Sequence, residues 1–100
     1  MHRARITWSE EQFRLGLPSV SETIDPAWFV SDEPRKHDGW SLVCRFTPSP
    51  SEQGNPSLAE VHFRMDDAPH SRLQPGTELQ LFERGSGTFA RVEILDGEER

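Results

Sequence analysis

Four side chains in the second half of the chain have the chemistry of metal ligands: His62, Asp66, Asp67 and His70. Imidazole nitrogens and carboxylate oxygens suit zinc or a harder divalent ion. Their spacing argues against a site, because His62 falls on the outer face of a predicted strand while the others belong to the turn that follows it. Neither a cysteine nor a third histidine completes the set. We therefore expect no metal and no other cofactor, and we interpret residues 66–69 as the start of a turn or short helix.

Nucleophilic catalysis finds little support in the sequence. The single cysteine, Cys44, shares an apolar strand register with Trp40, Leu42 and Phe46, which predicts a small buried hydrophobe rather than a reactive thiol. No Gly-x-Ser-x-Gly elbow is present, and the serines of the proline-rich loop lack a nearby base. The two members of each acidic pair, Glu10 with Glu11 and Asp66 with Asp67, are adjacent in sequence. The two catalytic acids of a glycosidase, in contrast, usually come from separate strands that face one cleft. A small enzyme with a pocket that the sequence does not reveal remains an alternative of another class.

Cationic and aromatic side chains are predicted on the outer surface of two strands. His62 and Arg64 share one strand, Phe89 and Arg91 share another, and groups of these kinds stack on or clamp single-stranded nucleic acid. Three glutamates are expected at neighbouring outward positions: Glu60, Glu78 and Glu93. Because their charges cancel the cationic field, a salt-bridged solvent face is the favoured interpretation and RNA is a disfavoured partner.

These side chains must be positioned by one small domain. The chain has 100 residues, 33% hydrophobic side chains and a net charge of -6, which together indicate a single domain over residues 1–100 with a modest core. The negative charge disfavours non-specific binding to nucleic acid or to an anionic membrane. With one cysteine, no signal-peptide pattern and no apolar run of the roughly 18 residues that a membrane span requires, we expect a cytoplasmic protein without membrane contact.

Alternation of apolar and polar residues predicts the strands, most clearly in the second half. Leu58–Met65 carries apolar side chains at every second position, and the pattern returns in Thr77–Phe82 and Thr88–Leu95. The last two segments are expected to pair as a hairpin, because glycines that accept positive φ lie between them. Trp40–Phe46 and Arg3–Trp8 are plausible strands of the first half. The count is five strands, or six.

Turn and loop signals separate the predicted strands. The residues 74–77, with the sequence Gln-Pro-Gly-Thr, fit a type II turn. Ser9 and Gln12 fit a capping box that opens one helical turn, with Gly16 as its stop. The segment from Thr47 to Ser57 is rich in proline and serine and is predicted to be a long exposed loop. The chain ends in a short acidic tail that contains Asp96, Glu98 and Glu99.

We predict an all-β fold: a small antiparallel β-barrel of about six strands, with a two-sheet sandwich as the runner-up. Trp8, Trp28 and Trp40 are expected at the ends of the barrel, and Trp28 with Phe29 is expected to plug one of them. The predicted core consists of Ile6, Leu42, Cys44, Phe46, Val61, Phe63, Met65, Leu79, Leu81, Ala90, Val92 and Ile94.

Several motifs together point to a known barrel. Leu73–Thr77 is a proline-glycine turn, Leu79–Gly85 is a strand that ends in an acidic-glycine hairpin, and Thr88–Val92 begins the last strand. These segments resemble the closing strands of the C-terminal β-barrel of translation elongation factor Tu-like proteins. The first half adds a similar strand and acidic, arginine-containing loop, at residues 5–7 and 10–18. The resemblance covers about half of the chain.

The resemblance implies a barrel whose relatives contact tRNA and other proteins through strand faces and loops. It does not imply nucleotide chemistry, which in the full factor belongs to a separate domain with a P-loop. No Gly-x-x-x-x-Gly-Lys pattern occurs in this chain, so we expect neither nucleotide binding nor GTP hydrolysis.

The expected function is that of a non-enzymatic binding module with a protein partner. Trp28 and Phe29 next to the charged Ser31–Gly39 loop combine the residue types that anchor protein interfaces. With the outward residues of the two strands, the predicted binding residues are Trp28, Phe29, His62, Arg64, Phe89 and Arg91. The alternative binding function is that of a small acidic immunity or inhibitor-type protein that neutralises a basic partner by charge complementarity.

Overall fold

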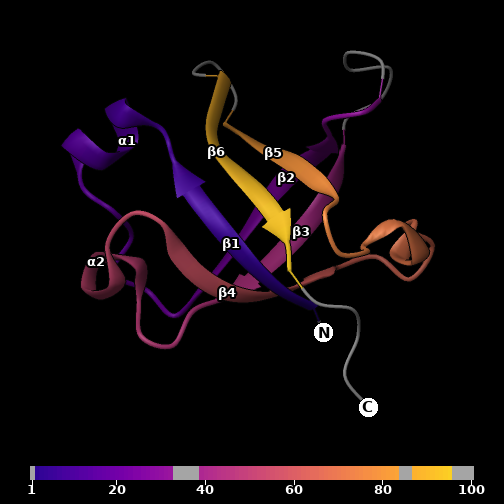
Figure 1. Cartoon of the computed structure of the whole chain (residues 1–100), viewed down its shortest axis with the longest axis horizontal. Coiled ribbons are helices and arrows are strands. Elements are labelled where there is room, and N and C mark those ends of the chain that lie inside the picture. The colour runs from indigo at the N-terminus through magenta and orange to yellow at the C-terminus, as the bar shows by residue number, and fades with distance from the viewer. Residues whose placement is uncertain (1, 33–38, 84–86, 96–100) are drawn as a thin grey trace.

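A computed structural model describes residues 2–32, 39–83 and 87–95. Six strands are joined by short helices and turns (Figure 1). In chain order the elements are β1 (His2–Trp8), α1 (Glu10–Leu15), β2 (Glu22–Phe29), β3 (Trp40–Arg45), α2 (Pro50–Gln53), β4 (Ser57–Phe63), the 3₁₀ helix η1 (His70–Arg72), β5 (Glu78–Glu83) and β6 (Gly87–Ile94).

The six strands form one closed antiparallel barrel in the order β1-β4-β3-β2-β5-β6, with β6 pairing back onto β1. The prediction of a small antiparallel barrel is therefore confirmed, and the sandwich is excluded. The predicted β5–β6 pairing is also confirmed. Each of the six described strands therefore pairs with a neighbour on both sides, an arrangement that protects strands from edge-to-edge association.

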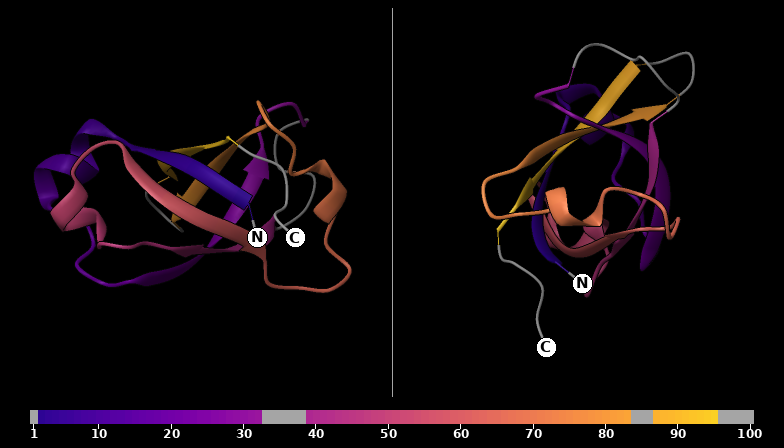
Figure 2. Two further views of the ribbon diagram at one scale, coloured as in Figure 1. Left: turned by 60° about the horizontal axis from the view of Figure 1, so that its bottom comes forward. Right: turned by 90° about the vertical axis from the view of Figure 1, so that its right-hand side faces the viewer.

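Two long connections close the barrel at its ends. The strand order places β1 opposite β2 and β4 opposite β5, so the connection with α1 and the connection with η1 must each cross one end. Figures 1 and 2 show α1 and α2 at one side of the barrel and the η1 turn at the other. We call these the α1 end, where β1 finishes at Trp8, and the η1 end, where β4 finishes at Phe63.

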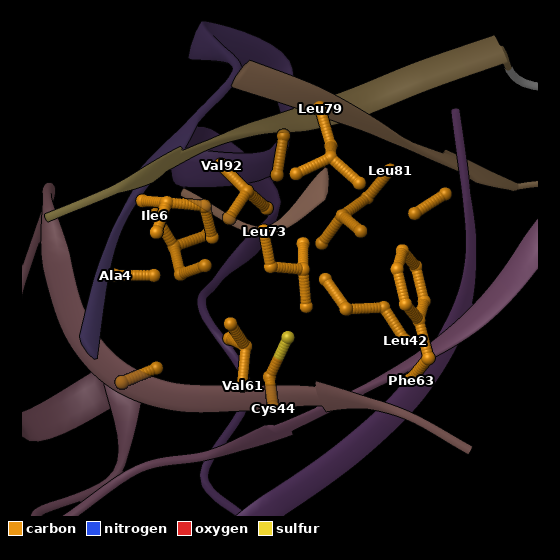
Figure 3. Packing of buried hydrophobic residues seen from close by; sticks show 14 of the residues in the cluster. Ala4, Ile6, Leu42, Cys44, Val61, Phe63, Leu73, Leu79, Leu81 and Val92 are labelled. Atoms are coloured by element: carbon orange, nitrogen blue, oxygen red, sulfur yellow. The ribbon is translucent and has the colours of Figure 1, made fainter. Parts of the chain in front are cut away.

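The interior is filled by the predicted core with one exception. All of the predicted core residues are buried except Met65, whose side chain is 52% exposed. The prediction was wrong for Met65 because β4 ends at Phe63, so the alternation stops before residue 65. The core also contains Leu73 from the η1 connection, which was not predicted; it is 2% exposed and packs among Ile6, Leu42 and their neighbours (Figure 3).

The strand that the sequence did not identify is β2, which contains the two residues expected to plug one end of the barrel. Phe29 lies inside the barrel, but Trp28 does not plug an end, because alternation along β2 turns it outward. Trp8 is buried at the α1 end, where its ring lies 6.1 Å from that of Phe46. Trp40 begins β3 and packs beside Phe63 at the η1 end. The expectation for the barrel ends thus holds for two of the three tryptophans.

The local turn signals are confirmed where the structure describes them. Ser9 caps α1 by accepting a hydrogen bond from the Gln12 backbone N–H, and Gly16 ends the helix with a φ of 114°. Gly76 has a φ of 90°, and the Thr77 N–H donates to the Gln74 carbonyl at 2.9 Å, as the predicted turn requires. Residues 84–86 of the hairpin, residues 33–38 of the Ser31–Gly39 loop and the acidic tail lie outside the described residues.

The segment from Thr47 to Ser57 differs from the exposed loop that was predicted. It contains α2, and its Pro50 and Ser57 side chains are buried. The Asn55 side-chain amide accepts from the Trp8 N–H at 2.9 Å and donates to the Trp8 carbonyl at 3.1 Å. These two bonds satisfy the backbone at the end of β1, so polar residues that bury little apolar area still fix this segment.

Candidate protein-binding surface

The outer side of β2 and β5 carries a group of apolar and aromatic residues. Because Ala27 and Phe29 of β2 and Leu79 and Leu81 of β5 face the core, the residues between them face outward. We call this the β2–β5 face, and it consists of Ile24, Pro26, Trp28, Gln80 and Phe82. Ile24 is 48% exposed although it lies in a strand, so the face presents apolar surface to solvent.

Trp28 and Phe82 form the centre of the β2–β5 face. Their ring centroids lie 4.5 Å apart at an interplanar angle of 76°, an edge-to-face arrangement that favours aromatic pairs beyond simple area burial. Gly39 backs the tryptophan so closely that a Cβ atom there would lie 2.8 Å from Trp28 Cε2. Phe82 and Gly39 therefore both restrict the orientation of the indole.

Phe29, the second aromatic residue of the predicted site, belongs to the core. Its side chain is 3% exposed, and the Arg72 guanidinium lies 3.7 Å from its ring centroid. Arg72 also donates to both carboxylate oxygens of Asp32 and to the Ser31 hydroxyl. This cation–π and ion-pair cluster ties η1 to the end of β2. Phe29 thus closes the η1 end and does not join Trp28 on the surface.

The predicted cationic surface is not assembled in one place, because β1 separates β4 from β6. Arg91 is opposite Thr7 of β1, whereas Val61, the neighbour of His62, is opposite His2. These two positions on β1 are five residues apart, which corresponds to about 17 Å along the strand. Arg64 lies beyond the end of β4 and is exposed. His62 and Arg91 therefore do not lie side by side on the outer surface of the barrel.

Phe89 does not face outward with Arg91 as predicted. The β5–β6 pairing shifts register so that Leu81 is opposite Ala90 and Phe82 is opposite Thr88, which leaves Phe89 as the extra residue of a β-bulge. Its ring stacks on Trp8 at 6.3 Å and 20° and packs against the core at the α1 end. A bulge interrupts the two-residue period, and for this reason the sequence alternation assigned Phe89 to the wrong side.

Ion pairs link the outward side chains of β5, β6 and β1, as the predicted salt-bridged face requires. Glu78 and Glu93 are directly opposite each other, and each has a cation beside it. Arg91 lies 3.5 Å from Glu78, and Arg5 lies 2.9 Å from Glu93. Glu60 is opposite Arg3 on one side and Arg45 on the other. Such exposed pairs each contribute little stability, about 0.2–1 kcal/mol, but they neutralise the cationic field.

An ionisable residue that the sequence did not single out points into the barrel. Asp25 is opposite the fully buried Leu42 and shares the inward side of β2 with Ala27. Burial, and secondarily the charge of Glu83, raise the pKa of the Asp25 carboxyl. Burial also raises the pKa of the Cys44 thiol to about 12, with a smaller contribution from the charge of Asp25. Cys44 is fully buried, as predicted, and its high pKa makes it a poor nucleophile.

The described residues also line hollows outside the β2–β5 face. An open one of about 410 Å³ spans β1, β4 and the end of β3, where Glu60 lies between Arg3 and Arg45. A smaller one of about 70 Å³ lies between α1 and the β5–β6 hairpin.

Within residues 2–32, 39–83 and 87–95, no three His, Cys, Asp or Glu side chains come together as a metal site. No helix in the described part of the chain has the length and apolar character to cross a membrane.

Sequence reasoning missed Phe82, which was not among the predicted binding residues. The sequence pattern could have identified it: Leu79 and Leu81 face the core, so Phe82, directly after Leu81 in the same strand, is expected to face outward. Its partnership with Trp28 could not be predicted, because β2 was not identified as a full strand beside β5.

Comparisons with family models, curated proteins and solved structures found no match for this chain.

Proposed function

We propose that this protein is a non-enzymatic binding module and that its partner, another protein, docks on the β2–β5 face. One observation carries the proposal: Trp28 and Phe82 pack edge to face outside the barrel wall instead of in the core. Tryptophan and other aromatic side chains that stand in a fixed orientation on a surface are the usual anchors of protein interfaces. The flanking Ile24 and Pro26 extend the apolar contact along β2.

The packing inside the barrel also supports binding at the outer surface. Side chains from all six strands and from the η1 connection fill it (Figure 3), so recognition falls to the outer surface. The resemblance of residues 73–92 to elongation factor Tu-like barrels agrees with this proposal, because members of that family use strand faces and loops for contacts. The fully buried, unpaired Cys44 suits a reducing compartment, and we propose the cytoplasm.

A comparison of two surface variants tests this function. The purified protein, immobilised on a resin, is incubated with soluble extract of the source cells, and retained proteins are identified and their affinities measured. Phe82→Ser removes half of the aromatic pair, while Leu58→Ser removes an apolar side chain that is 51% exposed on β4. We expect a protein that is retained by the wild type and by Leu58→Ser, and whose affinity for Phe82→Ser is at least tenfold weaker. Equal retention by all three forms would contradict the proposal.

A further inference from the structure

The strand β2 is paired to different extents on its two sides. Within the described residues, its ladder to β3 contains six residue pairs, which cover Glu22 to Ala27. Its ladder to β5 contains three residue pairs, which cover Ala27 to Phe29. We call the junction of β2 and β5 the β2–β5 seam. The described part of this seam is therefore joined over half as many residue pairs as the β3 side of the same strand.

A proline interrupts the β2–β5 seam on the side of the α1 end. The Val30 N–H donates to the Glu78 carbonyl at the start of β5 at 2.9 Å, and backbone groups along an antiparallel strand point alternately to its two neighbours. The backbone groups of Trp28 and Pro26 therefore also point toward β5. Of the six described strands only β2 contains a proline. Because proline has no N–H, the seam lacks one of its possible hydrogen bonds at this position.

Two carboxylates oppose each other where the β2–β5 seam ends. When the register of Ala27 with Leu81 is continued, Asp25 of β2 comes opposite Glu83, the last residue of β5. Burial, and secondarily the charge of Glu83, raise the pKa of the Asp25 carboxyl. The effect of Glu83 is a repulsion between two like charges, and like charges at opposite positions of paired strands weaken the pairing. The α1 end of the seam is therefore also weakened electrostatically.

Contacts at the η1 end hold the other end of the seam together. Arg72 donates to the two carboxylate oxygens of Asp32 at 3.2 and 2.8 Å, and its guanidinium lies over the Phe29 ring. These contacts fasten the end of β2 to the connection that leads into β5. Between the two ends, Trp28 of β2 and Phe82 of β5 pack across the seam with ring centroids 4.5 Å apart. The seam therefore has a fastened η1 end, an aromatic contact and a weakly joined α1 end.

We propose that the barrel opens along the β2–β5 seam, starting from the α1 end, and that this opening regulates the β2–β5 face. Because Trp28 and Phe82 belong to the two strands of the seam, opening separates the two rings and closure brings them together. A partner that contacts both rings binds the closed barrel and shifts the equilibrium toward it. This consequence for binding rests on the proposed function, whereas the opening itself does not.

Amide hydrogen exchange compares the two sides of β2 in the full chain without a partner. The N–H groups of Trp28 and Gln80 face each other across the seam, whereas those of Asp25 and Ala27 point toward β3. Two-dimensional NMR after transfer to D₂O gives the rates, which are corrected for the intrinsic exchange of each residue. We expect Trp28 and Gln80 to exchange at least about tenfold faster than Asp25 and Ala27, because they are released by local opening. Equal rates on the two sides of β2 would overturn the inference.

A matched pair of valine variants tests the cause of the opening. Pro26→Val supplies an N–H that points toward β5 and should slow the exchange of Trp28 and Gln80 at least about threefold. Ser41→Val, at the position directly opposite on β3, adds the same side chain without a new N–H and should change these rates less than about twofold. Equal effects of the two variants would contradict the role of Pro26.

The aromatic contact and the docking of a partner give separate results. Phe82→Ser removes the ring contact across the seam and should speed the exchange of Trp28 and Gln80 at least about threefold. Unchanged rates would mean that the aromatic pair does not respond to the seam, which contradicts the proposed regulation. Because all exchange rates are measured without a partner, they test the seam even where no protein docks on the β2–β5 face. Conversely, retention of a partner that depends on Phe82 would stand if the exchange rates on the two sides of β2 were equal.

Discussion

The indole N–H of Trp8 donates to the hydroxyl of Ser57 at 3.0 Å, and both groups are buried although 49 residues separate them in the chain. The same hydroxyl donates to the Gly54 carbonyl at 2.7 Å. Ser57 therefore satisfies one buried donor and one acceptor, and it connects the end of β1 to the start of β4.

Replacement of Ser57 tests how much this bridge contributes to stability. Ser57→Ala leaves the Trp8 N–H and the Gly54 carbonyl without their partner, which costs about 1–3 kcal/mol in the free energy of unfolding. Urea denaturation followed by tryptophan fluorescence measures the change. Ser51→Ala, at an exposed position of α2, is the control and should change stability by less than about 0.5 kcal/mol. Equal midpoints for the two variants would show that the bridge does not stabilise the fold.

Alanine substitution tests the close packing of Gly39 against Trp28, and Gly87, a glycine with the same φ, serves as the control. Gly39 and Gly87 both have a φ of 84°, but an added Cβ meets Trp28 only at Gly39 and open space at Gly87. Both alanine variants carry the strain of positive φ, and Gly39→Ala adds overpacking. We expect Gly39→Ala to be at least about 1 kcal/mol less stable than Gly87→Ala in thermal denaturation. If a protein partner docks on the β2–β5 face as proposed, the Gly39→Ala variant should also bind it more weakly, since the added Cβ displaces the indole.

The sequence predicted the barrel well where side chains alternate without interruption. β4 and β5 carry apolar residues at every second position, and their inward residues are buried as expected. β2 was harder to identify, because its inward residues include the polar Thr23 and Asp25 near the α1 end. The order of the strands in the barrel could not be predicted either. Alternation shows which side of a strand each residue faces, but it does not show which strands are neighbours.

The arrangement of the predicted binding residues differs from the one expected. Trp28 lies on the outer β2–β5 face, but its assignment beside Phe29 was wrong because adjacent residues of a strand face opposite sides. The hollow between α1 and the β5–β6 hairpin depends on the β-bulge at Phe89 and on the crossing of the barrel end by residues 9–21. Both features arise from tertiary pairing, and neither has a local sequence signal of comparable strength.

Asp25 predicts a specific dependence of stability on pH. Its pKa is raised in the folded protein, so the folded state binds more protons than the unfolded state between the ordinary carboxyl value and the raised one. Stability from this group is therefore full at acid pH and falls as pH rises through that interval. Asp25→Asn should flatten this part of the stability curve and raise the melting temperature at pH 7. A lower melting temperature for Asp25→Asn at pH 7 would contradict this assignment.

Cys44 serves as an internal probe of barrel opening. The thiol is 0% exposed and its pKa is raised to about 12, so the folded protein offers neither access nor thiolate. We expect a chromogenic disulfide reagent at pH 8 to label the native protein at least about 1,000-fold more slowly than the urea-unfolded chain, because labelling requires opening of the fold. Rapid labelling under native conditions would mean that the wall around β3 opens locally.

The central claim, that the β2–β5 face is where this barrel meets a protein partner, is tested most directly by photo-crosslinking in the source cells. A photoreactive phenylalanine analogue is placed at Ile24 on the face or at Leu58 on β4, two positions of similar exposure. We expect a discrete protein adduct from position 24 that is absent from position 58 and that disappears when Phe82→Ser is added. Adducts that are the same at both positions, or an adduct at position 24 that persists with Phe82→Ser, would contradict the account.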